Sequence, residues 1–209
     1  MSRNPKMRVA KPRVALVGDG ETEQIYFANV KDTDRPADLD LFPTLPKKKG
    51  TYRHVLDRAA ELVPDYDRVF ALIDMDTVIS DGHVEAYGRA KQIALDAGIV
   101  VLENNPCFEI WLLLHFVNTS RSFTRCGEVE YELQQPKRIP GYKKSKDFLI
   151  RAGLYKTHRT LIPTDAIPNA KRLEVERPIG NDRYPRAGTY LFFDWYVSPD
   201  RLKQLKKNK

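Results

Sequence analysis

Residues 68–76 constrain the fold more than any other part of the sequence. An apolar run with aromatic and β-branched members ends abruptly in Asp74 and Asp76. Such a run is typical of an interior strand of a parallel sheet, which is covered on both faces. The reactive crevice of open α/β sheets lies beyond the carboxyl ends of these strands. Because alternate side chains of a strand share a face, with Cα atoms about 6.5–7 Å apart, the two carboxylates are predicted to converge on one divalent cation or on neighbouring cations.

Composition narrows the class of protein and its partners. A chain of 209 residues suits one domain with a substantial core. It carries 35 basic and 28 acidic residues, which gives a formal net charge of +7 and a pI near 9.3. This balance favours an anionic partner, nucleic acid above all.

The cysteines and the N-terminus bear on localisation. Cys107 and Cys126 are too few for a disulfide framework and lack zinc-like spacing, which indicates a reducing compartment. The basic residues 1–13 contain no apolar h-region, so no signal peptide is expected. No apolar run approaches the length of a membrane span. The sequence therefore predicts a cytoplasmic protein with no membrane partner.

A second acidic motif follows the first predicted strand. Residues 13–17 form a short apolar strand that runs into Gly-Asp-Gly-Glu-Thr-Glu, residues 18–23, and then into a helical pattern. If the helix begins near Gly20, Asp19 and Glu23 lie on one face. Asp19 alone also fits a helix N-cap, with first-turn acids that complement the helix dipole. Its position beyond a strand parallel to the Asp74 strand favours a shared acidic cluster.

The remaining elements define the fold class. Strands are expected at residues 39–45 and 99–102, and helices at 51–63 and 84–97. The order βαβαβαβ predicts an α/β fold with a mostly parallel sheet flanked by helices. We expect this core over residues 1–120 and a mainly helical C-terminal extension, residues 121–209, packed on the same domain. Residues 188–197 are aromatic-rich and fit either a helix or a strand, with the aromatics in the core.

The most apolar helix is predicted at residues 108–116. Asn105 is a candidate cap and Pro106 suits the first helical position. Glu109 interrupts the apolar surface, and a buried carboxylate needs a partner or a metal. The alternative is an exposed first-turn glutamate. His115 is expected to be a packed, hydrogen-bonded histidine.

A basic loop with an aromatic residue occupies residues 139–146, before a helix at 147–152. Its lysines, Lys143, Lys144 and Lys146, are candidates to contact a phosphate, and Tyr142 is a candidate to stack on a base. The alternative is a solvated loop without function.

Together, the acidic glycine turn, the later Asp-x-Asp and the parallel α/β context resemble the Toprim fold. Residues 18–27, GDGETEQIYF, and residues 105–116, NPCFEIWLLLHF, are similar to the signature blocks of RloB-like proteins. That family is associated with bacterial restriction–modification and phage-defence loci, and its Toprim domain resembles those of the overcoming-lysogenization-defect nucleases. The resemblance spans most of the chain to about residue 150.

The resemblance implies a metal-dependent nuclease and assigns its residues. Glu23, Asp74, Asp76 and Glu109 match the family's acids, and Lys143 or Lys144 matches its basic loop. Asp19 stands where the family typically has a glutamate, and its side chain is one methylene shorter. The implied ligands of Mg²⁺ or Mn²⁺ are Asp19, Glu23, Asp74, Asp76 and Glu109. Glu23, Asp74, Asp76 and Lys144 are the implied catalytic residues, and Lys143, Lys144, Lys146 and Asn105 the candidate substrate contacts.

Two other functions fit parts of the sequence. Residues 70–78 also resemble the first motif of haloacid-dehalogenase-type phosphatases, in which Asp74 would be a phosphorylated nucleophile. The chain also fits a non-catalytic, nucleic-acid-binding accessory subunit. A separate ATPase or restriction–modification partner is an analogy only, because the sequence has no Gly-Lys-Ser/Thr phosphate loop of its own.

Overall fold

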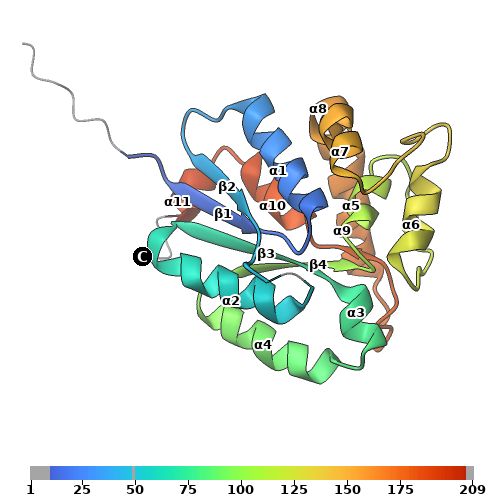
Figure 1. Cartoon of the computed structure of the whole chain (residues 1–209), viewed down its shortest axis with the longest axis horizontal. Helices are drawn as coiled ribbons and strands as arrows, with labels where there is room; N and C mark the ends of the chain where they lie inside the picture. The colour runs from blue at the N-terminus through green and yellow to red at the C-terminus, as the bar shows by residue number, and fades with distance from the viewer. Residues whose placement is uncertain (1–9, 49, 206–209) are drawn as a thin grey trace, which may run out of the picture.

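The computed structural model describes residues 10–48 and 50–205 and contains one five-stranded sheet of order β2-β1-β3-β4-β5 (Figure 1). The first four strands are parallel and β5 is antiparallel to β4. The strands are β1 (Arg13–Val17), β2 (Asp40–Thr44), β3 (Arg68–Asp74), β4 (Val100–Asn105) and β5 (Arg186–Ala187). The predicted α/β class with a mostly parallel sheet is confirmed.

Helices connect the strands and form most of the C-terminal half. Those within the parallel part of the chain are α1 (Glu21–Asp34), α2 (Tyr52–Leu62), α3 (Met75–Ser80), α4 (Val84–Asp96) and α5 (Glu109–Leu113). The C-terminal half contains α6 (Cys126–Leu133), α7 (Lys146–Ala152), α8 (Leu154–His158), α9 (Ile167–Glu176), α10 (Tyr190–Tyr196) and α11 (Arg201–Leu205). Short 3₁₀ and π-helical turns occupy Val63–Asp65 and Ile162–Ala166.

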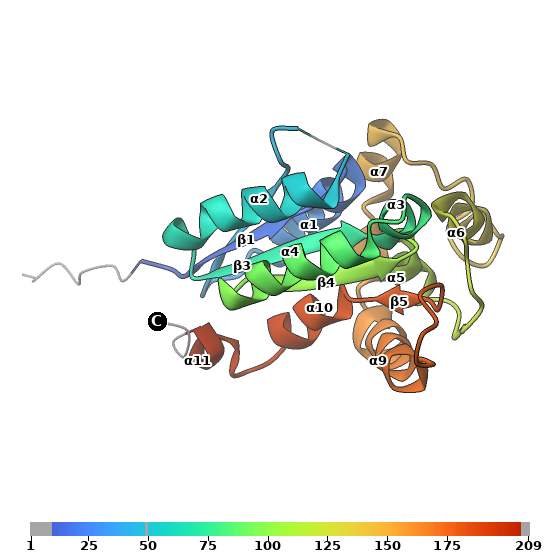
Figure 2. The same ribbon diagram turned by 90° about the horizontal axis from the view of Figure 1, so that it is seen from below.

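The sheet separates two apolar layers, as Figures 1 and 2 show. On one face, α2 and α4 pack on alternate strand residues such as Ala71 and Ile73. On the other face, Phe70 and Leu72 join a larger core built with α1, α5 and α10. Burial on both faces explains why these strands are continuously apolar.

The C-terminal half completes the core of the sheet. Its buried aromatics on α10, Phe192 and Phe193 among them, belong to the same apolar cluster as β1, β3 and α1. Phe193 stacks on Trp111 of α5, with ring centroids 5.1 Å apart. Residues 188–197 therefore form mainly a helix in the core. β5 was not predicted, because two residues are too short to give a pattern.

Two local predictions are wrong. The helix expected over residues 108–116 is only α5, Glu109–Leu113. Asn105 does not cap it: the residue ends β4, and its amide donates to the carbonyls of Asp182 and Tyr184 at 2.7 and 2.8 Å. His115 is buried, as expected, with Nδ1 2.9 Å from the Trp111 carbonyl oxygen, and burial lowers its pKa to about 4.

Two features expected from the sequence concern the N-terminal segment and membrane-spanning helices. Residues 1–9 of the basic N-terminal segment lie outside the described residues. Within the part of the chain that is described, none of the helices has the length and apolar character needed to span a bilayer.

Gly188, the residue after β5, lies so close to β4 that a side chain at this position should destabilise the fold. Gly188 N donates to Glu103 O at 2.7 Å, and a Cβ on Gly188 would lie 2.6 Å from the backbone N and O of Glu103. Gly188→Ala should therefore lower the free energy of unfolding in urea by roughly 1–3 kcal/mol, the usual cost of overpacking.

Gly127→Ala is the matched control. Gly127 lies in α6, and a Cβ there would meet nothing within 4 Å. Alanine should leave stability unchanged or raise it slightly, because glycine is a poor helix former. Equal urea midpoints for the two variants would contradict this account of the β4–β5 contact.

Candidate metal centre

The acidic residues predicted from the sequence gather at the carboxyl edge of the sheet, on the face covered by α1 and α5. β1 and β3 are neighbours, and the chain leaves them toward opposite sides, from β1 to β2 and from β3 to β4. Such a switch point is where open α/β sheets bind ligands. The turn after β1 carries Asp19 and Glu23, and β3 ends at Asp74.

Two glycines allow Glu23 to fold back over this turn. A Cβ on Gly18 would lie 2.8 Å from Glu23 Cβ, and one on Gly20 would lie 3.1 Å from Glu23 Oε2. Gly20 N donates to Glu23 Oε2 at 3.2 Å, and the side chain is buried. Burial, then the charge of Glu109, raises the pKa of Glu23 to about 7.

Asp74 joins the end of β3 to the start of α5. Its Oδ1 accepts a hydrogen bond from Phe108 N at 2.8 Å. Burial raises the pKa of Asp74 well above its ordinary value, and the charges of Glu23 and Glu109 raise it further. The three carboxylates are thus close enough to disfavour one another's ionisation.

Glu109 is fully buried and has the partners that the sequence required. Its Oε1 accepts from the Tyr142 hydroxyl at 2.8 Å, and its Oε2 accepts from Lys144 Nζ at 3.0 Å. Lys144 Nζ also lies 3.5 Å from Glu130 Oε1. Burial lowers the pKa of Lys144, but Glu109 and Asp74 more than offset this, so the pKa lies above its ordinary value.

Asp19 and Asp76 are partly buried acids of the cluster, and the charge of Asp76 acts on Asp19. Asp19 Oδ1 is buried and has no hydrogen-bond partner among the described residues. Burial raises the pKa of Asp19, a hydrogen bond from the Gly50 backbone partly offsets the rise, and the charge of Asp76 adds to it. Asp76 Oδ1 accepts from Thr77 N at 2.7 Å.

The predicted geometry of the Asp-x-Asp pair is wrong. The strand ends at Asp74, and Asp76 lies in the first turn of α3. The chain turns there because the N–H groups of Met75 and Asp76 both donate to the Pro106 carbonyl, each at 2.9 Å. The two carboxylates therefore reach the cluster from a strand end and a helix start.

The charge balance of the cluster fits a divalent cation. Four carboxylates, Asp19, Glu23, Asp74 and Glu109, interact with one ammonium group, that of Lys144, and Asp76 adds its negative charge near Asp19. Like charges in a desolvated site are costly unless a cation neutralises them. The donors are all hard oxygens, and Asp19 Oδ1 has no hydrogen-bond partner within residues 10–48 and 50–205. These residues fit Mg²⁺ or Mn²⁺ better than a softer metal.

The candidate substrate contacts divide into one inside the cluster and three outside it. Lys144 is inside. Lys143 and Lys146 are exposed and make no hydrogen bond or ion pair with other described residues. The Asn105 amide is fully engaged by the 182–184 backbone. Tyr142, expected to stack on a base, is instead buried with its hydroxyl on Glu109, a contact that the sequence of the loop did not signal.

The cysteines also differ from expectation. Cys107 and Cys126 form a disulfide, whereas their small number suggested reduced thiols. Cys107 lies two residues before Glu109, the first residue of α5, and Cys126 begins α6, so the bond joins the starts of these two helices. Residues 19 apart in the sequence give no indication of such a pairing.

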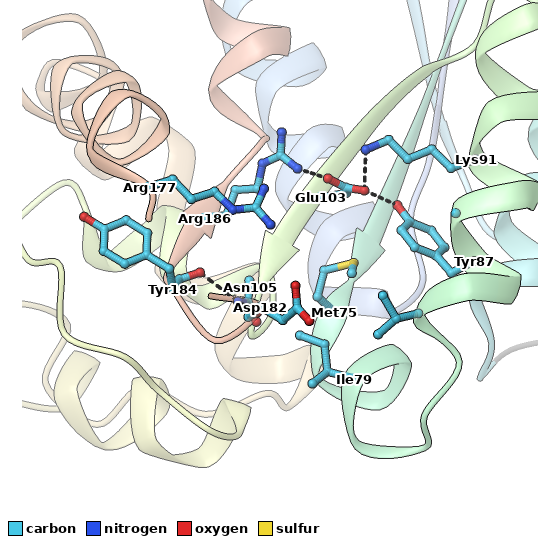
Figure 3. Close-up of a pocket in the computed structure, with 12 residues that line it drawn as sticks. Met75, Ile79, Tyr87, Lys91, Glu103, Asn105, Arg177, Asp182, Tyr184 and Arg186 are labelled. Atoms are coloured by element: carbon cyan, nitrogen blue, oxygen red, sulfur yellow. Dashed lines mark hydrogen bonds and ion pairs between the residues drawn. The ribbon is translucent and has the colours of Figure 1, made fainter. Parts of the chain in front are cut away.

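A separate cavity of about 220 Å³ lies at the same edge but on the opposite face, beside α4 (Figure 3). Three of its charged groups, Glu103, Lys91 and Arg186, form one network. Glu103 Oε1 accepts from Tyr87 OH at 2.7 Å and from Lys91 Nζ at 2.6 Å, and Oε2 pairs with Arg186. This network ties β4 to α4 and β5, which makes it a structural feature rather than a second catalytic centre.

Comparison with known proteins identifies a family but not an activity. A family model described as RloB-like protein matches residues 14–191, which include every residue of the acidic cluster. No curated protein and no solved structure matches the chain.

The raised pKa of Glu23 predicts how the metal-free protein responds to pH. In the unfolded chain Glu23 ionises near pH 4.5, but in the folded protein only near pH 7. The folded state thus binds the extra proton, and its stability falls as pH rises from about 4.5 to 7. Glu23→Gln should remove this loss, so with a chelator its stability advantage over wild type should grow by roughly 3 kcal/mol across that range.

Urea denaturation at several pH values measures this difference. Glu85→Gln, a change of an exposed glutamate on α4, should show no such growth. A pH-independent difference between Glu23→Gln and wild type would show that Glu23 is not in a crowded acidic site.

Proposed function

The chain belongs to the RloB-like family, and on this premise we propose that it is a metal-dependent nuclease that hydrolyses phosphodiester bonds of nucleic acid. The observation that carries the proposal is the convergence of acids from three distant segments around one lysine, with a buried Asp19 oxygen that has no hydrogen-bond partner among the residues the structure describes. A cluster built only to stabilise the fold would pair its buried carboxylates.

Some residues of the site would bind cations, and others would contact the substrate. Asp19, Glu23, Asp74 and Glu109 would hold one or two Mg²⁺ or Mn²⁺ ions, with Asp76 adding its negative charge near Asp19. The ions would supply an activated water and offset charge on the attacking and leaving oxygens. Phe108 N fixes the Asp74 carboxylate, and the Tyr142 hydroxyl orients Glu109.

Lys144 is the residue best placed to act on the substrate directly. Its side chain is 38% exposed, although its Nζ contacts the fully buried Glu109. It can therefore reach a phosphate at the mouth of the cluster while remaining anchored. An ammonium group there would offset the charge that develops on the phosphate during displacement.

The substrate class follows from charge and from the family resemblance. The net charge of +7 favours a polyanion over a small phosphomonoester. The resemblance to Toprim nucleases of defence loci extends the proposal to cleavage of DNA or RNA, tRNA included, in anti-phage defence or beside a restriction–modification system. A separate ATPase partner is part of the same proposal.

Cleavage assays test the catalytic role of Asp74. With Mg²⁺ or Mn²⁺, Asp74→Asn should lower the rate of cleavage of plasmid, single-stranded DNA or tRNA by about 10²-fold or more. The substitution replaces the negative charge of a proposed metal ligand with a neutral amide. Asparagine retains an oxygen for Phe108 N, so folding should persist. Asp96→Ala, on the exposed end of α4, should cleave at the wild-type rate.

Three outcomes of this assay separate the candidate functions. Full activity of Asp74→Asn with either metal would refute the proposed mechanism. Salt-dependent binding without any cleavage would favour a nucleic-acid-binding accessory subunit. A covalent phosphoenzyme trapped at Asp74 with a small phosphomonoester would favour the phosphatase.

Thermal unfolding tests the metal separately from the substrate. Mn²⁺ binds the folded cluster and not the unfolded chain, so at 100 times its Kd it should stabilise wild type by about 2.7 kcal/mol. Asp74→Asn should have a higher melting temperature than wild type in chelator and should gain less from Mn²⁺. Equal gains for both proteins would place the metal elsewhere.

A further inference from the structure

The Cys107–Cys126 disulfide lies against the groups on which the proposed function depends. Cys126 Sγ is 3.0 Å from Glu109 Oε2, and Lys144 Nζ donates to the same sulfur at 3.1 Å. The two sulfurs and a Glu109 oxygen all lie within 4.8 Å of one another. A change at this bond therefore acts directly on a candidate metal ligand.

The two sulfurs differ in access. Cys107 is fully buried, whereas Cys126 is half-buried at the start of α6. An external thiolate can approach Cys126 Sγ, and Cys107 Sγ is then the leaving group. Access to one sulfur is what thiol–disulfide exchange requires.

We infer that the Cys107–Cys126 pair is a site of reversible dithiol–disulfide exchange and that its reduction weakens divalent-cation binding by the acidic cluster. This inference rests on the proposed function. A thiolate of a small dithiol attacks Cys126 Sγ, the S–S bond breaks, and Cys107 leaves with the electron pair and takes a proton. The second thiol of the reagent then displaces Cys126, which is also protonated. Two electrons and two protons reach the protein, and the reagent becomes a cyclic disulfide.

The direction of the effect follows from hydrogen bonding at Glu109. A disulfide sulfur has no hydrogen to donate, so among the described residues Lys144 is the one donor that contacts Glu109 Oε2. After reduction, the Cys126 S–H lies at donor distance from the same oxygen. With the Tyr142 hydroxyl on Oε1, three donors then compete with a cation for one carboxylate.

The crosslink also holds the segment that positions Glu109. α6 and the loop after it carry Tyr142 and Lys144, and the bond joins this segment to the start of α5. Without the bond, the ordering of that segment depends on its packing alone. Both effects of reduction act against metal binding.

Metal titration of the oxidised and reduced chain tests the inference. The reduced protein is freed of reagent by gel filtration without oxygen, its thiols are counted with Ellman's reagent, and Mn²⁺ is titrated by calorimetry. We expect two thiols per chain and a Kd for Mn²⁺ several-fold higher than in the oxidised protein, restored on reoxidation. Equal Kd values in the two states, or no thiols released from the folded protein, would overturn the inference.

Two matched variants isolate the sulfhydryl donor from the loss of the crosslink. Cys107→Ala with Cys126→Ala removes the bond and the donor, whereas Cys107→Ala with Cys126→Ser removes the bond but keeps a donor. Neither should respond to a dithiol, and the serine variant should bind Mn²⁺ several-fold more weakly than the alanine variant. Equal affinities of the two variants would overturn the hydrogen-bond account.

Cleavage measured in both redox states separates this inference from the nuclease proposal. Cleavage in neither state, together with a redox-dependent Kd for Mn²⁺, would refute the nuclease and support the redox site. Cleavage with equal Kd values in the two states would refute the redox site alone.

Discussion

Mutual repulsion among desolvated carboxylates is the interaction on which the rest of this structure depends. Glu23 and Glu109 are buried and Asp74 is partly buried; the charge of Glu109 raises the pKa of Glu23, and the charges of both raise the pKa of Asp74. A single ammonium group, that of Lys144, offsets part of their charge. Such a cluster opposes folding unless it binds a cation, so its presence in a folded chain is better explained by function than by stability.

An extensive apolar core offsets the unfavourable free energy of these crowded carboxylates. Aromatic side chains from α1, α5 and α10 pack on one face of the sheet, and α2 and α4 cover the other. Hydrogen bonds hold the acids in place: Gly20 N donates to Glu23, Phe108 N to Asp74, and the Tyr142 hydroxyl to Glu109. Among the described residues, no three of these carboxylates have ligand oxygens within 4.8 Å of one another, so a bound cation would draw the side chains closer together.

The features predicted correctly from the sequence are those that follow from continuous patterns of residues, such as buried strands. The apolar runs of β1 and β3, the glycine turn and the isolated Glu109 in an apolar helix together favoured a cluster of acids at one edge of a parallel sheet. Prediction failed where a contact between distant segments decides the local structure. The Pro106 carbonyl turns the chain into α3 before Asp76, and the 182–184 backbone takes the Asn105 amide. The sequence around Asp76 and Asn105 contains no pattern that indicates these contacts.

The most direct test of the central claim is a crystal structure of the chain grown with Mn²⁺ and measured for anomalous scattering. The account predicts one or two anomalous peaks enclosed by Asp19, Glu23, Asp74 and Glu109, with oxygen ligands at about 2.0–2.6 Å. Peaks confined to other parts of the surface, with the acidic cluster empty of metal, would contradict it.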